Sequence, residues 1–225
     1  FRGMSVSPNQ IIVGAGTEYL YGLIIQLLGR DSVYGVENPG YQKIQHIYDA
    51  YQVKCCYIDM DESGVNIDSL ERSGLMCAYI TVTPFPTELS LRRAGDMNCW
   101  AGRQSRSRYI IEDEYDSEFR LVGNPIPALQ SIDASDKVIY MNTFSKSLSS
   151  TIRISYMVLP IPLMVRYNHI LSFYACTVSN FDQYTLTRFI QEGYLEKHIN
   201  RMRSFTGTAG TGYLVVSGVT GCIHR

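Results

Sequence analysis

A lysine flanked by small hydroxyl residues is the feature of the sequence that most directly suggests covalent chemistry. Lys146 lies in Thr143-Phe144-Ser145-Lys146-Ser147, directly after the apolar run 138–141. An apolar setting lowers the pKa of a lysine, and the free amine can then form a Schiff base with a carbonyl group. A surface charge is the more common role of a single lysine, so the assignment depends on its companions.

Two further features could hold a phosphate group. Arg153 lies at the start of the next predicted strand, 152–159, and could return to the Lys146 loop and bind a phosphate in a bidentate manner. The turn Gly14-Ala15-Gly16-Thr17 follows a short apolar run and opens a predicted helix. The free N–H groups and the positive end of such a helix favour phosphate.

The glycine turn has two other interpretations. A dinucleotide site is one, because Glu37 follows at a suitable distance to bind a ribose. The third glycine of that fingerprint is absent, since Tyr19 stands in its place. A strand-to-helix turn without any ligand is the other, because a pair of glycines alone is a weak signal.

Five carboxylates crowd the end of another predicted strand, in Glu112-Asp113-Glu114-Tyr115-Asp116-Ser117-Glu118. They are compatible with a solvated acidic turn or with a Mg²⁺ or Ca²⁺ site, but strand alternation prevents all five from facing one ion. A single carboxylate can also face a protonated pyridine nitrogen, with a tyrosine donating to a ring oxygen. Asp113 and Tyr115 share one face of an extended segment and suffice for that role.

An aromatic residue follows a third predicted strand. Tyr41 comes directly after Asn38-Pro39-Gly40, where its ring could stack on a planar cofactor, although packing is the more common role of tyrosine. The four histidines form no H-x-x-x-H pair and the six cysteines form no C-x-x-C pair. These spacings predict neither a zinc site nor a disulfide framework.

The elements that must hold these residues alternate between strands and helices. Strands are predicted at 10–13, 32–37, 53–58, 75–81, 109–111, 138–141 and 152–159, and helices at 20–28, 41–51, 163–171, 181–191 and 194–203. This alternation predicts an α/β fold, a three-layer α/β/α domain with a mostly parallel sheet. The candidate residues follow strands, and ligands of such sheets lie beyond the carboxyl ends of the strands.

Composition limits the classes of function. The chain has 225 residues, 45% of them hydrophobic, and a formal net charge of −1, which fits one large globular domain and disfavours nucleic-acid binding by this chain itself. No apolar run approaches the ~20 residues that span a bilayer. The cysteines are expected to be reduced, which is typical of cytoplasmic proteins. Because the first residue is Phe1 and not methionine, we expect a piece of a longer protein.

Taken together, four segments resemble the aminotransferase-like domain of MocR-type regulators, which are GntR-family transcription factors fused to a fold-type I pyridoxal-phosphate domain. The resemblance covers about residues 2–87 and 107–203. Its segments are Ile11-Ile12-Val13-Gly14-Ala15-Gly16-Thr17-Glu18-Tyr19-Leu20, Glu37-Asn38-Pro39-Gly40-Tyr41, Ile110-Ile111-Glu112-Asp113-Glu114-Tyr115-Asp116-Ser117-Glu118-Phe119, and Thr143-Phe144-Ser145-Lys146-Ser147-Leu148 with Arg153-Ile154-Ser155-Tyr156.

The resemblance implies pyridoxal 5'-phosphate as the cofactor and gives each candidate a role. Lys146 would be the Schiff-base lysine, Asp113 the partner of the pyridine nitrogen, and Tyr115 the donor to the ring hydroxyl oxygen. Tyr41 would stack on the ring. The phosphate would be surrounded by Gly16, Thr17, Thr143, Ser145 and Arg153. Glu18 is also expected to be one of the cofactor-binding residues.

The chain also departs from the family. Residues 1–203 are assigned to the aminotransferase large domain, within which 88–106 are atypical, and 204–225 are an atypical tail in place of the small C-terminal domain. That small domain normally holds the arginine that binds the substrate carboxylate. The loop Thr81-Val82-Thr83-Pro84-Phe85-Pro86-Thr87-Glu88 is one residue shorter than the family loop and lacks its histidine and glycine. The winged-helix DNA-binding domain of the family is expected upstream of Phe1.

We therefore expect a pyridoxal-phosphate-binding, aminotransferase-like domain from a transcriptional regulator. Its partners would be a small amino acid or amine and, in the full-length parent, a second copy, with no membrane and no nucleic acid bound by this chain itself. One alternative is an effector-sensing domain without transaminase turnover, and another is a defective remnant. A NAD-binding oxidoreductase is the more remote alternative.

Overall fold

The computed structural model describes residues 3–61, 64–75, 77–81, 96–97, 100–101, 108–114, 128–148 and 151–208. The strands are β1 (Ile11–Gly14), β2 (Val33–Asn38), β3 (Lys54–Asp61), β4 (Gly64–Val65), β5 (Cys77–Thr81), β6 (Tyr109–Asp113), β7 (Val138–Thr143) and β8 (Ser155–Val158). The helices are α1 (Thr17–Leu28), α2 (Gln42–Ala50), α3 (Ile67–Arg72), α5 (Phe144–Ser147), α6 (Ile161–Ile170), α7 (Asn180–Gln191) and α8 (Tyr194–Thr208), with 3-10 turns η1 (Pro8–Gln10) and η3 (Leu129–Ile132).

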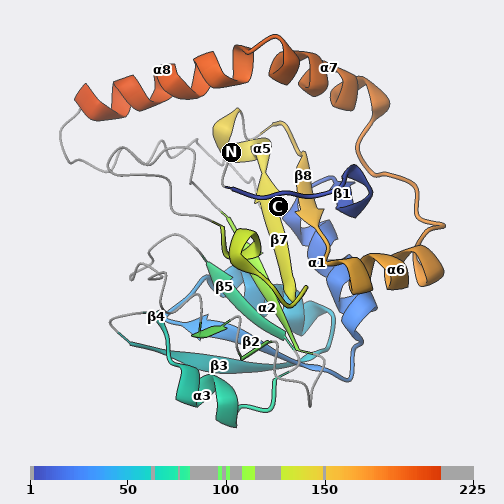
Figure 1. The fold of residues 1–225 in the computed structure, drawn as a ribbon, viewed down its shortest axis with the longest axis vertical. Coiled ribbons are helices and arrows are strands. Elements are labelled where there is room, and N and C mark those ends of the chain that lie inside the picture. The colour runs from blue at the N-terminus through green and yellow to red at the C-terminus, as the bar shows by residue number, and fades with distance from the viewer. Residues whose placement is uncertain are drawn as a thin grey trace, which may run out of the picture.

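The strands form one sheet in the order β1-β8-β7-β6-β5-β2-β3-β4 (Figure 1). The five neighbouring strands β7, β6, β5, β2 and β3 are parallel. At one side β8 is antiparallel to both β7 and β1, and at the other side β4 is antiparallel to β3. The mostly parallel sheet predicted from the sequence is therefore confirmed.

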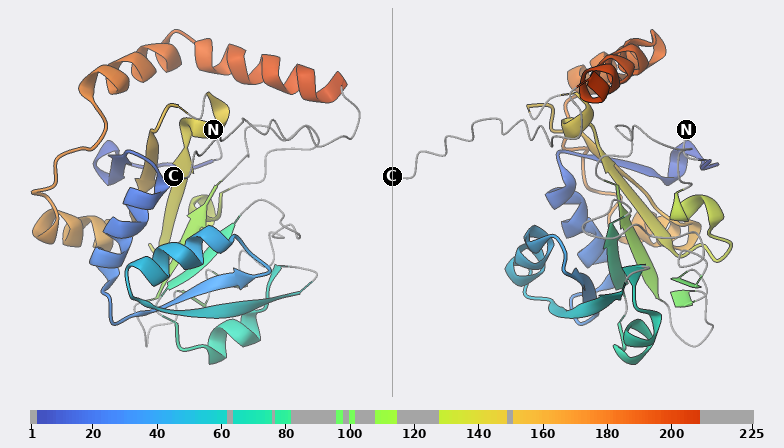
Figure 2. Two further views of the ribbon diagram at one scale, coloured as in Figure 1. Left: turned by 180° about the vertical axis from the view of Figure 1, so that it is seen from behind. Right: turned by 90° about the vertical axis from the view of Figure 1, so that its left-hand side faces the viewer.

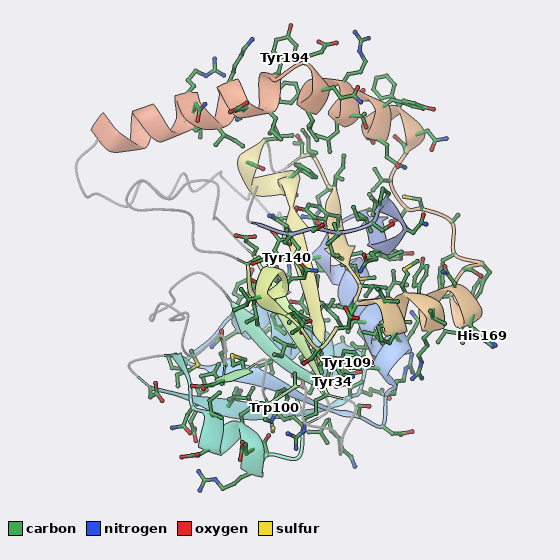
Figure 3. All side chains as sticks on the ribbon, viewed as in Figure 1. Tyr34, Trp100, Tyr109, Tyr140, His169 and Tyr194 are labelled. Carbon is green, nitrogen blue, oxygen red and sulfur yellow. The ribbon has the colours of Figure 1, made fainter. Side chains whose placement is uncertain are left out.

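Helices cover both faces of this sheet (Figure 2). On one face lie α1, which packs on β7 and β8, and α2, which packs on β2 and β3. Their buried side chains form one core together with Ile111 of β6 and Ile139 of β7. On the other face lie α3 and η3, where Leu70 and Leu129 pack with Ile110 and Trp100 in a second core (Figure 3). Alternate residues of the central strands thus feed opposite cores, which is why these strands are continuously apolar.

Helix α1 is the element that carries most of the first core. Leu20, Leu23, Ile24 and Leu27 recur at helical spacing and are each at most 1% exposed. The helix ends at Gly29, whose φ of 98° lies in a region that glycine enters without a steric cost. This packing fixes the first two turns of α1 beside the carboxyl ends of the central strands.

Helices α7 and α8 lie beyond the carboxyl ends of the parallel strands and cross above α5 (Figures 1 and 2). Helix α7 has no buried residue, and Tyr194 at the start of α8 projects away from the sheet (Figure 3). Among the described residues, no helix combines the length and apolar character needed to cross a bilayer.

Candidate functional site

The sheet register brings three of the predicted segments to one edge. Gly14 at the end of β1 and Thr143 at the end of β7 both align with Ser155 at the start of β8. On the other side of β7, Asp113 at the end of β6 aligns with Met141. The glycine turn, the Lys146 segment and the acidic segment therefore meet beyond the carboxyl ends of adjacent strands, where ligands of such sheets bind.

Lys146 lies in α5, a single helical turn that follows β7 directly. The turn is held from both sides, because Phe144 N–H donates to the Ile154 carbonyl and Leu148 N–H donates to the Phe144 carbonyl, each at 2.9 Å. The backbone of Lys146 is thereby fixed at the edge of the sheet. Its side chain lies outside the described part of the structure.

A chain of hydroxyl groups shapes this turn. Thr143 is the N-cap of α5, and its Oγ1 accepts from Ser145 N–H at 3.3 Å and from the Ser155 hydroxyl at 2.9 Å. The Ser145 hydroxyl donates to the Ile152 carbonyl at 2.6 Å. These bonds tie the end of β7 to the start of β8 and bring Arg153 back to the edge, as the sequence predicts.

Arg153 reaches the glycine turn. Its Nη2 contacts Oε2 of Glu18 at 2.8 Å. Gly16 has a φ of 100°, and a Cβ added there would lie 2.5 Å from Nη2 of Arg153. Gly16 is therefore required twice, once by its backbone angle and once by the guanidinium group. It is also the N-cap of α1 and makes no side-chain cap hydrogen bond.

Glu18 lies between two cations in the first turn of α1. Besides Arg153 it accepts a hydrogen bond from Lys43, which comes from α2. Partial burial acts to raise the pKa of Glu18, but the hydrogen bond from Lys43 and the charges of Lys43 and Arg153 outweigh it and lower the pKa below its usual value. The carboxylate thus stays ionised beside the guanidinium group.

Asp113 projects from the end of β6 toward α1. Its Oδ2 accepts a hydrogen bond of 2.8 Å from the Tyr21 hydroxyl. Burial raises the pKa of Asp113 to about 6, against the opposing effect of the Tyr21 bond. A carboxyl group near the edge of a sheet with such a pKa is typical of a functional site.

The neighbouring carboxylates face the other side of the sheet. Glu112 accepts from Leu129 N–H at 2.7 Å and from Gln130 N–H at 3.0 Å, and so caps η3. Glu114 accepts a hydrogen bond from the hydroxyl of Tyr140, which aligns with Glu112 in the register of β6 and β7. The alternation predicted for this segment is confirmed, and no cluster of metal-ligating side chains is found among the described residues.

Two predicted site residues are placed less completely. Tyr41 is the N-cap of α2 at the carboxyl end of β2, with 54% of its surface exposed. It lies on the expected edge of the sheet, separated from β7 by β5 and β6. Tyr115 lies outside the described residues.

Sequence reasoning missed three residues that contact the predicted ones. They are Tyr21, Lys43 and Thr177, whose Oγ1 accepts from Ala15 N–H in the glycine turn at 2.9 Å. Tyr21 follows Glu18 at a spacing of one helical turn, which places both on one side of α1, and this was the available signal. Lys43 and Thr177 come from distant parts of the chain and had no local signal.

The sheet order disfavours a dinucleotide site. In that fold the strand before the glycine turn lies beside the strand that carries the acidic residue. Here β8, β7, β6 and β5 lie between β1 and Glu37 on β2. Gly14 has another explanation, because a Cβ there would lie 2.6 Å from the ring of Tyr19.

The donors at this edge fit the phosphate and the ring of pyridoxal phosphate. An arginine, the N-terminus of α1 without a side-chain cap, and a glycine pressed against the guanidinium group match a phosphate dianion. A carboxyl group within the same edge matches a protonated ring nitrogen.

Known structures agree with this arrangement. The fold matches the kynurenine aminotransferase of Pyrococcus horikoshii with a TM-score of 0.76 and 25% identity, over 90% of this chain and 53% of that one. A pyridoxal-phosphate-bound C–S lyase from Staphylococcus hominis has the same fold, with a TM-score of 0.77 over 92% of this chain and 55% of that one. The chain therefore has the fold of the large domain of fold-type I pyridoxal-phosphate proteins.

The sequence narrows this class further. Over 90% of its length the chain is 39% identical to the HTH-type transcriptional regulator YdeL of Bacillus subtilis, and 30% identical to the probable rhizopine catabolism regulatory protein MocR of Rhizobium meliloti. The chain is therefore homologous to a part of MocR-type HTH regulators. The chain spans only 44% and 41% of the lengths of these two relatives. No protein-family model matches it.

Proposed function

We propose that the chain binds pyridoxal 5'-phosphate at this edge and holds it covalently through the amine of Lys146. The observation that carries the proposal is the meeting of Lys146, Asp113 and Arg153 beyond three adjacent strands. When bound, the cofactor supplies a carbonyl group for an amine and an electron-withdrawing ring.

Each predicted residue then has a physical task. Arg153 and the N-terminus of α1, with Gly16 and Thr17, neutralise the phosphate, while Thr143 and Ser145 hold the α5 turn beside it. Asp113 keeps a proton on the ring nitrogen, and contact with that positive charge lowers its own pKa. In this proposal Tyr115 donates to the ring oxygen and Tyr41 covers the ring. Glu18 pairs with Arg153 until the phosphate binds.

Cofactor binding can be tested by visible absorption spectroscopy. Titration of the chain with pyridoxal phosphate is expected to give a visible absorption band that is lost in Lys146→Ala. The matched control is Lys54→Ala, because Lys54 is exposed at the start of β3, on the opposite edge of the sheet. A band that persists unchanged in Lys146→Ala would refute the assignment.

The relatives favour a sensor over a transaminase as the role of the whole protein. They are named transcriptional regulators, and the chain covers less than half of their length. We propose a small amino acid or amine as the effector, a homodimer as the assembled parent and the bacterial cytoplasm as its location. We also propose the large domain to be residues 1–203, with 88–106 and 204–225 atypical in sequence.

Sensing and catalysis can be separated in the full-length parent. We expect its DNA binding to change when both cofactor and an amine ligand are present, with no accumulation of a keto acid from an amino acid. Sustained transfer of amino groups, with DNA binding insensitive to the ligand, would favour an aminotransferase instead.

A further inference from the structure

We propose that Tyr21 is a positioning residue for Asp113: its hydroxyl holds Oδ2 and thereby presents Oδ1 to the pyridine nitrogen of the cofactor. This inference rests on the proposed function and deepens it, because Tyr21 belongs to none of the roles derived from the sequence. The residue comes from the second turn of α1, not from the strand ends that carry the other candidates.

Packing fixes the position of the Tyr21 hydroxyl. The side chain is fully buried, and its ring meets the ring of Tyr48 edge-on, with centroids 6.2 Å apart and an interplanar angle of 86°. Tyr48 is itself packed against Tyr34, with centroids 5.0 Å apart. Three aromatic rings from α1, α2 and β2 thus hold a single O–H at 2.8 Å from Asp113.

A phenol has one proton to donate, so it can satisfy only one of the two carboxylate oxygens. With Oδ2 engaged, the plane of the carboxyl group is set, and Oδ1 is the atom available to a second donor. A protonated ring nitrogen is such a donor, and it requires the carboxylate to be ionised. Tyr21 favours the ionised form, because its hydrogen bond stabilises the negative charge.

Other groups around Asp113 act in both directions. Burial is the largest influence and raises its pKa, and Glu114 directly after β6 and Glu18 on α1 raise it further. Tyr21 on α1 and Lys43 on α2 lower it. Lys43 is already engaged by Glu18, so Tyr21 is the one of the two that also bonds Asp113 directly.

The test measures Asp113 before any cofactor is added. Carbon-13 NMR of labelled aspartate, with the Asp113 signal assigned from Asp113→Asn, gives the pKa of Asp113 in the chain and in Tyr21→Phe. We expect the pKa to rise by about one pH unit in Tyr21→Phe, or ~1.4 kcal/mol. The matched control is Tyr34→Phe, which removes a buried hydroxyl of the same cluster that donates to the Gly29 carbonyl at 2.9 Å. It is expected to leave the pKa of Asp113 unchanged.

A second substitution keeps the test decisive if Tyr21→Phe does not fold. Incorporation of 3-fluorotyrosine at position 21 retains the ring and makes the hydroxyl a stronger donor, so the pKa of Asp113 should fall. A pKa of Asp113 that stays unchanged in the folded variant would overturn the inference.

The cofactor titration separates this inference from the proposed function. We expect Tyr21→Phe to retain the visible band that depends on Lys146, with the pH at which half-maximal binding occurs shifted upward relative to Tyr34→Phe. The pKa of Asp113 could rise in Tyr21→Phe as expected while the chain forms no such band. That result would refute cofactor binding and leave the hydrogen bond from Tyr21 to Asp113 standing. A band with identical pH dependence in both variants would refute the role of Tyr21 alone.

Discussion

Arg153 already forms an ion pair, because its Nη2 lies 2.8 Å from Oε2 of Glu18. A bound phosphate must share or take this cation. The pair is well exposed, with 53% of the Arg153 side chain and 38% of the Glu18 side chain accessible, so the ion pair itself is weak. Phosphate can therefore compete for Arg153 at a small cost.

We predict that Glu18→Gln strengthens the binding of inorganic phosphate by about two- to fivefold, because exposed ion pairs contribute ~0.2–1 kcal/mol. Isothermal titration with phosphate measures the effect. Glu192→Gln is the matched control, since Glu192 pairs with Arg188 at 2.9 Å on the surface of α7. Unchanged or weaker phosphate binding by Glu18→Gln would contradict the assignment of Arg153 to the phosphate.

Gly16 offers a second test of the proposed phosphate site, which consists of Arg153 and the N-terminus of α1. We predict that Gly16→Ala weakens phosphate binding by about ten- to a hundredfold, because the added methyl group displaces a charge-assisted contact worth ~1.5–3 kcal/mol. Gly193→Ala is the control, since Gly193 also has a positive φ, of 73°, but a Cβ there meets nothing within 4 Å. Both variants should lose stability through backbone strain, and only Gly16→Ala should lose phosphate affinity. Equal affinities of the two variants would show that Gly16 serves the backbone alone.

The raised pKa of Asp113 makes the stability of the cofactor-free chain depend on pH. The carboxyl group ionises near pH 4 when the chain is unfolded and near pH 6 when it is folded, so between these values the folded state retains a proton that the unfolded state has lost. We predict that the free energy of unfolding falls by up to ~3 kcal/mol as the pH rises from about 4 to about 6.

Urea unfolding of the chain and of Asp113→Asn at several pH values isolates this effect. The difference between the two proteins should change across that range and stay constant above it. A difference that is flat from pH 4 to pH 7 would mean that Asp113 ionises normally in the folded chain.

At the scale of elements, η3 depends on one carboxylate. Glu112 is fully buried and accepts two backbone N–H groups at the start of η3. We predict that Glu112→Gln destabilises the chain by ~1–2 kcal/mol and Glu112→Ala by more, because a buried donor left without its partner is costly. Thermal unfolding measures both, and added Mg²⁺ should change neither. A stabilising effect of Mg²⁺ that requires Glu112 would instead revive a metal site.

The sequence predicts helices and strands reliably where a regular apolar pattern extends over many residues. Helix α1 and the central strands follow from their apolar spacing, and they lie within a few residues of the predicted ranges. Short elements such as α3, α5 and η3 were not predicted, because four to six residues hold too little periodicity. The antiparallel insertion of β8 beside β7 depends on contacts between distant residues, which no local pattern contains.

The candidate site could be predicted in part for the same reason. Many of the motifs lie at strand ends, so Asp113 and Lys146 were predicted from their positions at the ends of strands, and Arg153 from its position at the start of the next strand. Tyr21 lies inside α1 among apolar residues, so the sequence pattern indicates a core position. It does not indicate that the Tyr21 hydroxyl bonds Asp113 at the end of β6. Its contact with Asp113 is a long-range hydrogen bond between α1 and the end of β6, which no local motif contains.

At the scale of the whole molecule, the sheet order has a functional consequence. The separation of β1 from β2 by four strands disfavours the dinucleotide interpretation, and the return of the chain into β8 brings Arg153 to Glu18 in the first turn of α1. The account therefore depends on one central claim, which is that this edge holds pyridoxal phosphate on Lys146.

Reductive trapping tests that claim most directly. The chain is mixed with pyridoxal phosphate, reduced with borohydride, digested and mapped by mass spectrometry, with Lys43 and Lys54 serving as internal reference lysines. The account predicts a single pyridoxyl-phosphate adduct on Lys146, formed at low cofactor excess and blocked by inorganic phosphate. An adduct distributed over several lysines, or absent from Lys146, would contradict it.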